Sequence, residues 1–149
     1  MPMRTGTPLP ELGGATEWIN SPAGRADLVG SPLLVHFWAV SCHVCHDNMP
    51  TVAAWREQHA ADGLKVVAVH MPRQPEDMDV ERVRADAASM GITEPLAVDN
   101  THGVADAFQN EFVPAYFLFD AEGNLRSRAA GYTGLSMLEG ALKRVLGVS

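Results

Sequence analysis

Cysteine is scarce in this sequence of 149 residues, which contains only Cys42 and Cys45. Two cysteines cannot make the set of disulfide bonds that holds many small extracellular domains together, so the chain must fold around a hydrophobic core. Hydrophobic residues form 46% of the sequence and charged residues 19%, as in an ordinary globular protein. The length is that of a single domain.

Positive charge and long apolar runs are also lacking. The formal net charge is −7 and the lysines and arginines do not cluster, which argues against nucleic acid and anionic membranes as partners. No apolar run is long enough to span a membrane, and residues 1–16 lack the hydrophobic region of a secretion signal. We therefore expect a cytoplasmic protein, or a periplasmic or other extracytoplasmic one if an export signal has been trimmed from the sequence.

The two cysteines lie in a well-defined local setting. Residues 33–39 form a nearly continuous apolar run, typical of a strand that is covered on both faces. A helix is expected from about residue 43 to residue 60, with Pro50 inside it. The segment from Cys42 to Cys45 therefore falls at the turn between strand and helix. Two thiols in that position suit dithiol–disulfide exchange, in which a thiolate attacks a disulfide.

The rest of the sequence predicts one small α/β domain. We expect residues 1–14 to be a flexible N-terminal lead-in and residues 15–149 to form the domain, with a right-handed strand–helix–strand unit at its centre. Asn100 or Thr101 is expected to cap one helix, and Ser136 with Glu139 to form a capping box at the start of the last helix. The other expected strands are residues 16–20, 64–69, 96–98, 115–120 and 125–130, and the other helices are residues 25–29, 80–90, 100–109 and 136–146.

Two stretches of the sequence resemble a known family. FWAVSCHVCHDNMP, followed roughly seventy residues later by FVPAYFLFDAEGNL, is similar to the thioredoxin-like proteins of the TlpA type, especially the thioredoxin-like domains of DipZ-type membrane proteins. The resemblance covers about residues 12–147. It implies the thioredoxin fold, in which a central mixed β-sheet is flanked by helices on both faces. It also implies a thiol–disulfide oxidoreductase that acts on protein disulfides.

The chemistry of such an enzyme assigns different roles to the two cysteines. Cys42 is expected at a helix N-terminus, where unpaired N–H groups and the helix dipole favour a thiolate, so it is the expected nucleophile. Cys45 would resolve the mixed disulfide. A purely structural disulfide is disfavoured because a bridge that closes so small a loop removes little chain entropy.

The resemblance also implies what accompanies this chemistry. No cofactor is expected beyond the redox-active disulfide. The expected partners are protein thiols and disulfides and a redox partner, either a DipZ-like membrane protein or a thioredoxin reductase system. We expect a monomer without stable membrane insertion.

Two further features concern the surroundings of the nucleophile. The resemblance implies a cis bond between Val113 and Pro114, with the Val113 backbone beside Cys42 and able to pair with an extended substrate. Ser41 stands where most thioredoxins have Trp, so one wall of the usual active-site surface is missing. His43, between the cysteines, is either a cation that stabilises the thiolate or an exposed spacer.

Proton transfer is the step that the sequence leaves open. His36 occupies the strand position where thioredoxin has a buried Asp, and Asn48 stands where TlpA-type reductases often carry an acidic residue. The usual buried carboxylate is therefore absent from both positions. His36 is either a core histidine with its hydrogen bonds satisfied or a proton shuttle to Cys45.

Other classes of protein share the same short motif. Cys42, Cys45 and His46, with His43 and the distant His70 or His102, form an alternative zinc- or copper-binding module. Residues 42–46 also fit the C-x-x-C-H motif of c-type haem attachment, but a strand–helix junction offers haem no pocket. The Pro and Thr of peroxiredoxin sites are missing before Cys42. In the oxidoreductase interpretation, His46 is expected to be a neutral surface residue.

Overall fold

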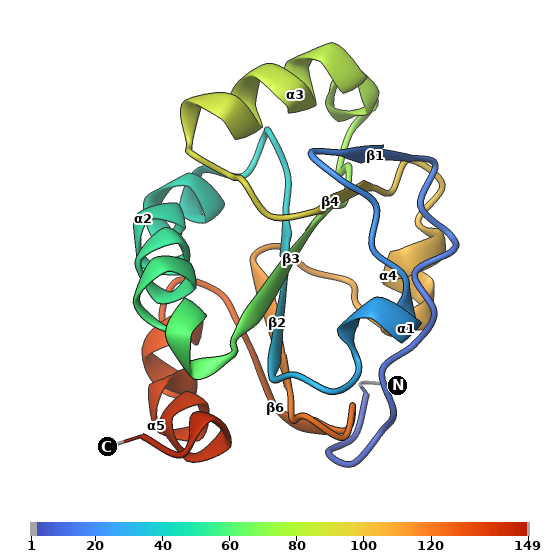
Figure 1. The fold of residues 1–149 in the computed structure, drawn as a ribbon. Coiled ribbons are helices and arrows are strands. Elements are labelled where there is room, and N and C mark those ends of the chain that lie inside the picture. Colours follow the sequence, from blue (N-terminus) through green and yellow to red (C-terminus); the bar gives the residue numbers. More distant parts are fainter. Residues whose placement is uncertain (1–2, 149) are drawn as a thin grey trace.

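The computed structural model describes residues 3–148, which form a six-stranded mixed sheet with helices on both faces (Figure 1). The strands are β1 (Glu17–Ile19), β2 (Leu33–Trp38), β3 (Lys65–His70), β4 (Leu96–Val98), β5 (Ala115–Phe119) and β6 (Leu125–Ala130). The helices are α1 (Arg25–Leu28), α2 (His43–Gln58), α3 (Val80–Ser89), α4 (Gly103–Ala107) and α5 (Gly134–Leu146), and two 3₁₀ turns are η1 (Ala60–Asp62) and η2 (Pro75–Met78). No helix in the described part of the chain is long and apolar enough to cross a membrane.

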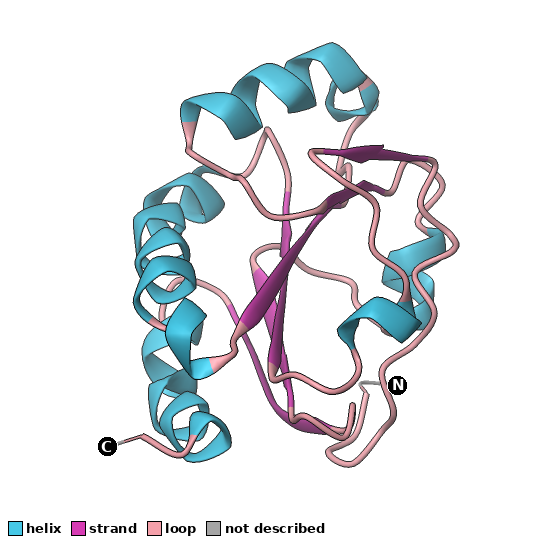
Figure 2. Cartoon of the chain, viewed as in Figure 1, coloured by secondary structure: helices cyan, strands magenta, loops and turns pink. Residues whose placement is uncertain are grey.

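The sheet has the strand order β1-β4-β3-β2-β5-β6. Strands β2, β3 and β4 run parallel, whereas β5, β6 and β1 each run antiparallel to a neighbour. Strand β2 lies near the middle of the sheet and all six of its residues are buried, which explains its unbroken apolar sequence. The predicted fold class, a thioredoxin fold with a mixed sheet covered on both faces, is confirmed (Figure 2).

The two faces of the sheet carry two separate hydrophobic layers. Alternate residues of a strand point to opposite faces, so Leu34 and Trp38 join the layer beneath α2 and α5, while Val35 and Phe37 join the layer beneath α1 and α4. In the second layer the Phe37 ring packs edge-on against the Phe108 ring, with centroids 5.3 Å apart. In both layers, the strands contribute every second residue and the helices contribute residues three or four positions apart.

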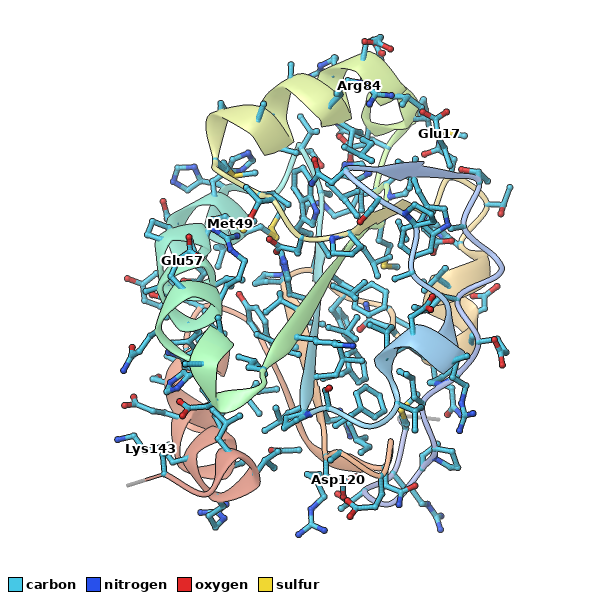
Figure 3. All side chains as sticks on the ribbon, in the orientation of Figure 1. Glu17, Met49, Glu57, Arg84, Asp120 and Lys143 are labelled. Carbon is cyan, nitrogen blue, oxygen red and sulfur yellow. A yellow bond between two sulfur atoms is a disulfide. The ribbon has the colours of Figure 1, made fainter. Side chains whose placement is uncertain are left out.

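Helix α2 packs one face against the sheet. Its buried residues recur every three or four positions, as an amphipathic helix requires; they are Cys45, Met49, Val52 and Trp55. Met49 points from α2 toward the sheet, whereas Glu57 points away from it (Figure 3). The inner face of α2 therefore begins with a cysteine, which fixes Cys45 between the helix and the sheet.

The N-terminal segment differs from the expected lead-in. Residues 3–14 run along the domain, and three of their apolar side chains are only 2% exposed: Met3, Leu9 and Leu12. The Gly6 N–H donates to the Leu125 carbonyl at 2.7 Å, and the Leu125 N–H donates to the Thr7 carbonyl at 2.8 Å. This segment is thus part of the packed fold. Residues 1 and 2 lie outside the described part, and the domain boundary at residue 15 stays a prediction.

Two helices begin differently from the sequence prediction. Neither Asn100 nor Thr101 caps α4; the Asp99 carboxylate accepts the N–H groups of Val104 and Ala105, both at 2.8 Å. A carboxylate is a good acceptor for the unpaired N–H groups of a helix start. Asp99 does so from the end of a strand, several residues before the helix, which is why a local cap pattern did not identify it.

Helix α5 begins two residues earlier than predicted, at Gly134. The Ser136 hydroxyl donates to the Thr133 carbonyl at 2.9 Å instead of accepting from the helix, so the predicted capping box is wrong. Gly134 lies so close to β5 that a Cβ atom there would come within 2.9 Å of the Tyr116 ring. The absence of a side chain at residue 134 therefore lets the helix start against the sheet.

Candidate active site

Cys42 and Cys45 form a disulfide bond at the N-terminus of α2. Cys42 is the N-cap residue, and its sulfur accepts a hydrogen bond from the Cys45 N–H at 3.1 Å. The two cysteines are only 3% and 2% exposed. The Cys42 sulfur thus lies where the free N–H groups of the first helical turn point. The same groups would stabilise a Cys42 thiolate once the disulfide is reduced.

Three residues hold the turn before Cys42, and we call them the Ser41 clamp: Ser41, Arg73 and Asp77. The Ser41 hydroxyl donates to Asp77 Oδ2 at 2.6 Å. The Arg73 guanidinium donates to the Ser41 carbonyl at 2.6 Å and to its hydroxyl oxygen at 3.2 Å. The Arg73 backbone N–H donates to the same Asp77 oxygen at 3.0 Å. Ser41 therefore sits between a cation and an anion from the segment after β3.

Asp77 stays ionised although it is only 1% exposed. Burial raises the pKa of its carboxyl, but the hydrogen bonds from Ser41 and the Arg73 N–H, with the nearby charge of Arg73, bring that pKa below its usual value. The clamp consequently contains two opposite full charges. Arg73 contacts Ser41, the residue that stands where most thioredoxins have Trp.

His46 attaches the first turn of α2 to α3. Its Nδ1 lies 2.7 Å from the Cys42 carbonyl oxygen, and its Nε2 lies 2.7 Å from an Asp86 carboxylate oxygen. Both partners only accept hydrogen bonds, so the imidazole donates to both when it carries both protons. Burial lowers the pKa of His46, but the bonds to Cys42 and Asp86 outweigh that effect and raise it above 6.5. The structure thus places His46 in a half-buried, hydrogen-bonded position between two helices instead of on the free surface, where it was expected.

His43 has a different environment. Its side chain is 90% exposed, and its Nε2 lies 3.6 Å from an Asp47 carboxylate oxygen on the same helix face. A charge in water interacts weakly with its neighbours. Of the two interpretations left open for His43, this exposure favours the spacer.

His70, at the end of β3, supports the backbone just before the disulfide. It is fully buried, and its Nε2 accepts the Val40 N–H at 3.0 Å. Its ring lies edge-on to the Trp38 ring with centroids 4.8 Å apart. Burial lowers the pKa of His70 to about 4, so the ring is a neutral acceptor at physiological pH. The sequence pattern did not indicate this role.

A second charged group lies deeper, and we call it the buried network: His36, Arg56 and Glu94. His36 Nε2 lies 2.6 Å from Glu94 Oε2, and the Arg56 guanidinium donates to Glu94 Oε1 at 2.6 Å. Burial raises the pKa of Glu94, but its bonds and charge interactions with His36 and Arg56 lower that pKa to about 2. A buried carboxylate is therefore present after all, supplied by the segment before β4.

The opposite side of the disulfide is tied together by an amide. The Asn48 side chain donates to the Tyr116 hydroxyl at 3.1 Å and to the Tyr132 carbonyl at 3.3 Å, which joins α2 to β5 and to the loop before α5.

The peptide bond between Val113 and Pro114 is cis. Val113 packs against both hydrophobic layers, one of which contains both cysteines.

Comparison with known proteins places this arrangement in a family. Residues 6–128 match the family described as AhpC/TSA. The chain belongs to the AhpC/TSA family. Thiol-disulfide oxidoreductase YkuV of Bacillus subtilis is 46% identical over 97% of this chain and 97% of its own length.

Other relatives of this AhpC/TSA chain agree with the predicted resemblance. Protein DipZ of Mycobacterium bovis is 32% identical over 92% of this chain, which spans 20% of DipZ. The expected resemblance to DipZ is thus confirmed, although YkuV is more similar. The solution structure of a thioredoxin-like protein in the oxidized form superimposes with a TM-score of 0.88, at 46% identity, over 97% of this chain and 98% of its own. A thiol-disulfide isomerase from Corynebacterium glutamicum, at 19% identity and a TM-score of 0.78, shares the fold.

The alternative metal site does not form in this AhpC/TSA chain. Cys42 and Cys45 are bonded to each other, and within residues 3–148 no three His, Cys, Asp or Glu side chains gather as metal ligands. His70 Nε2 accepts the Val40 N–H, and His102 Nε2 lies 2.8 Å from the Pro72 carbonyl. The geometry thus gives the metal hypothesis no ligand set.

The structure brings some of the predicted site residues together and separates others. Ser41, His43 and the two cysteines share the turn into α2, whereas His36 is hydrogen-bonded to Glu94. This contact favours the satisfied core histidine over the proton shuttle. Sequence analysis missed four residues that arrive from elsewhere in the chain: Arg73, Asp77, Asp86 and Glu94.

Proposed function

We propose that this chain catalyses thiol–disulfide exchange on protein disulfides, with Cys42 as the nucleophile and Cys45 as the resolving thiol. The observation that carries the proposal is the Cys42–Cys45 disulfide at the N-cap of α2, with the Cys45 N–H on the Cys42 sulfur. YkuV, which is 46% identical, is likewise named a thiol-disulfide oxidoreductase.

The exchange proceeds in two balanced steps. In the reduced enzyme, the Cys42 thiolate attacks one sulfur of a substrate disulfide; a new S–S bond forms, the substrate S–S bond breaks, and the leaving sulfur takes up a proton. The Cys45 thiol then loses its proton and attacks Cys42. This step releases the second substrate sulfur as a thiol and leaves the enzyme with its own disulfide.

The protein groups around Cys42 serve the thiolate form. The first N–H groups of α2, the Arg73 guanidinium on the Ser41 carbonyl and the His46 ring on the Cys42 carbonyl all place positive charge near that sulfur. Two electrons move with the sulfur–sulfur bonds themselves, so the proposed reaction needs no cofactor beyond the redox-active disulfide.

Substrate binding is proposed at the cis Val113–Pro114 bond. An extended substrate segment pairs there with the Val113 backbone, which presents the substrate sulfur to Cys42. The Val113 side chain packs against both hydrophobic layers, including the one that holds both cysteines, which supports this placement.

The redox partner follows from the compartment, which is itself a proposal. In the cytoplasm, the donor of two electrons would be a thioredoxin reductase system; for an exported form, it would be a DipZ-like membrane protein. We propose that the protein works as a monomer without nucleic acid or stable membrane insertion. Cell fractionation tests the compartment, and trapping of the partner on Cys42 then tests the redox partner.

The decisive experiment compares two cysteine variants on a protein disulfide substrate. We expect Cys42→Ser to abolish reduction, because the attacking sulfur is gone. We expect Cys45→Ser to accumulate mixed disulfides on non-reducing electrophoresis, because the first step proceeds and the second cannot. Activity retained in Cys42→Ser, or no mixed disulfide in Cys45→Ser, contradicts the assignment.

The direction of the reaction is measured with the wild-type protein. Equilibration in glutathione buffers with thiol trapping gives the reduction potential of the pair. A value near about −270 mV indicates a reductant, and one near about −120 mV an oxidant. A pair that does not titrate as a two-electron couple contradicts the function itself.

A further inference from the structure

The cation of the Ser41 clamp binds Ser41, the residue that precedes the proposed nucleophile Cys42. The Arg73 guanidinium donates to the Ser41 carbonyl at 2.6 Å, and that carbonyl belongs to the peptide bond that links Ser41 to Cys42. A second bond, at 3.2 Å, goes to the Ser41 hydroxyl. Two contacts to one residue fix the guanidinium in orientation as well as in position.

Asp77 holds the backbone of Arg73 and the hydroxyl of Ser41 on the buried side of the clamp. The buried Asp77 carboxylate accepts both the Ser41 hydroxyl and the Arg73 backbone N–H on the same oxygen, at 2.6 and 3.0 Å. Asp77 is 1% exposed, whereas Arg73 is an exposed residue. An approaching molecule therefore meets the positive group, while the negative one is covered by protein.

The positive charge of Arg73 is opposite in sign to the net charge of the whole chain. The net charge is −7, which disfavours acidic partners at long range. Charges of exposed groups act over only about 10 Å at ordinary ionic strength. A single fixed cation next to Cys42 consequently acts on the substrate residues that flank the attacked disulfide, and much less on the substrate as a whole.

We propose that Arg73 is a specificity-determining residue, which favours substrate disulfides with an aspartate or glutamate next to the attacked cysteine. The inference rests on the proposed function and deepens it by naming a substrate class. It also explains Ser41: its small hydroxyl side chain accepts from Arg73 and donates to Asp77, and an indole could not accept such a bond.

The test uses two disulfide peptides of the same composition and the same net charge. One carries Glu next to the cysteine, and the other carries it at the far end of the peptide. We expect the wild-type protein to reduce the first with a kcat/KM about three-fold to five-fold higher, the size of an exposed ion pair. The preference should decrease in about 0.5 M NaCl, because salt screens exposed charges.

Variants then assign the preference to one residue. Arg73→Gln should remove it, and Arg73→Lys should restore most of it because the charge returns. Arg82→Gln is the matched control: Arg82 is another exposed arginine, and its guanidinium donates to the Glu76 carbonyl instead of to Ser41. This control should keep the wild-type preference.

The outcomes separate the inference from the function on which it rests. If the wild-type protein reduces neither peptide, the proposed function fails. If it reduces both equally, or if Arg73→Gln keeps the preference, Arg73 does not determine specificity although the enzyme is intact. If both Arg73 variants slow the two peptides by the same factor, Arg73 only positions the turn, and the inference is again overturned.

Discussion

The two ends of helix α2 are held by charged groups that differ in their contact with water. At the N-terminal end, the Ser41 clamp presents an exposed arginine beside the disulfide. Farther along the helix, the buried network joins side chains that are 2%, 16% and 3% exposed in the order His36, Arg56 and Glu94. An arginine contact of 2.6 Å thus occurs in both groups, to a carboxylate in the buried network and to a backbone carbonyl in the clamp, in two different dielectric settings.

This difference teaches what each group can do. A charge without its partner in the interior costs several kcal/mol, so buried pairs hold the structure in one arrangement and are not free to react. An exposed cation contributes little to stability, but substrates can reach it. Burial therefore separates the group that fixes α2 from the group that faces the chemistry.

The largest expected effect comes from breaking the buried network. Glu94→Gln leaves Arg56 and His36 without their anion, and we expect the free energy of unfolding to fall by about 3 kcal/mol. Urea unfolding of the oxidised protein measures this change. The matched control is Glu17→Gln, because Glu17 pairs with Arg84 at 3.0 Å on the surface, with side chains 46% and 47% exposed (Figure 3).

The control should cost less than about 1 kcal/mol. Equal losses for Glu94→Gln and Glu17→Gln would show that burial does not distinguish these pairs, and the comparison would fail.

Acid should reveal the same network in the unaltered protein. The pKa of Glu94 is about 2 in the folded chain and 4.5 in its ordinary state, so its carboxylate adds stability above pH 4.5. That contribution is lost as the pH falls from about 4.5 toward 2, and it amounts to about 3 kcal/mol. Unfolding curves over this range measure the slope. A slope that is as steep in Glu94→Gln as in the wild type would assign it to other groups.

The smallest effect concerns the two histidines near the disulfide. The pKa of His46 is raised above 6.5 in the fold, so its stabilising contribution is complete below pH 6.5 and is lost as the pH rises through the folded value. We expect His46→Asn to cost about 1 kcal/mol at pH 5.5 and less at pH 9. His43→Asn is the control, since that side chain is 90% exposed. The same loss for His46→Asn at both pH values would contradict the charged state.

The sequence sufficed for features that depend on neighbouring residues. The apolar run of β2, the turn that holds Cys42 and Cys45, and the helix that follows are local patterns. They predicted a small α/β domain whose two thiols suit disulfide exchange, and the family resemblance added the thioredoxin fold and the oxidoreductase. The family resemblance added the cis bond before Pro114, which no local pattern requires. The clearest local errors were the helix starts, where a cap was assigned to nearby Asn100 or Thr101.

The charged contacts of the site could not be predicted in this way. Arg73 lies 32 residues from Ser41, and Glu94 lies 58 residues from His36, so these pairs exist only once the strands are side by side. A weak signal was present at Glu94, a lone acid before Pro95 and a buried strand. No such signal marks Asp86, which looks like one more polar residue on the surface of a helix.

The N-terminal segment has a consequence for the behaviour of the protein in concentrated solution. Strand β6 is one edge of the sheet, and residues 6–8 cover its beginning through the bonds to Leu125 and a bridge between Pro8 and Asn124. Uncovered edges accept strands from other molecules and seed aggregation, and exposed arginines such as Arg126 and Arg128 discourage such pairing along the remainder. Removal of residues 1–10 would uncover the beginning of β6. Expression tags therefore belong at the C-terminus, and the first residues are best retained.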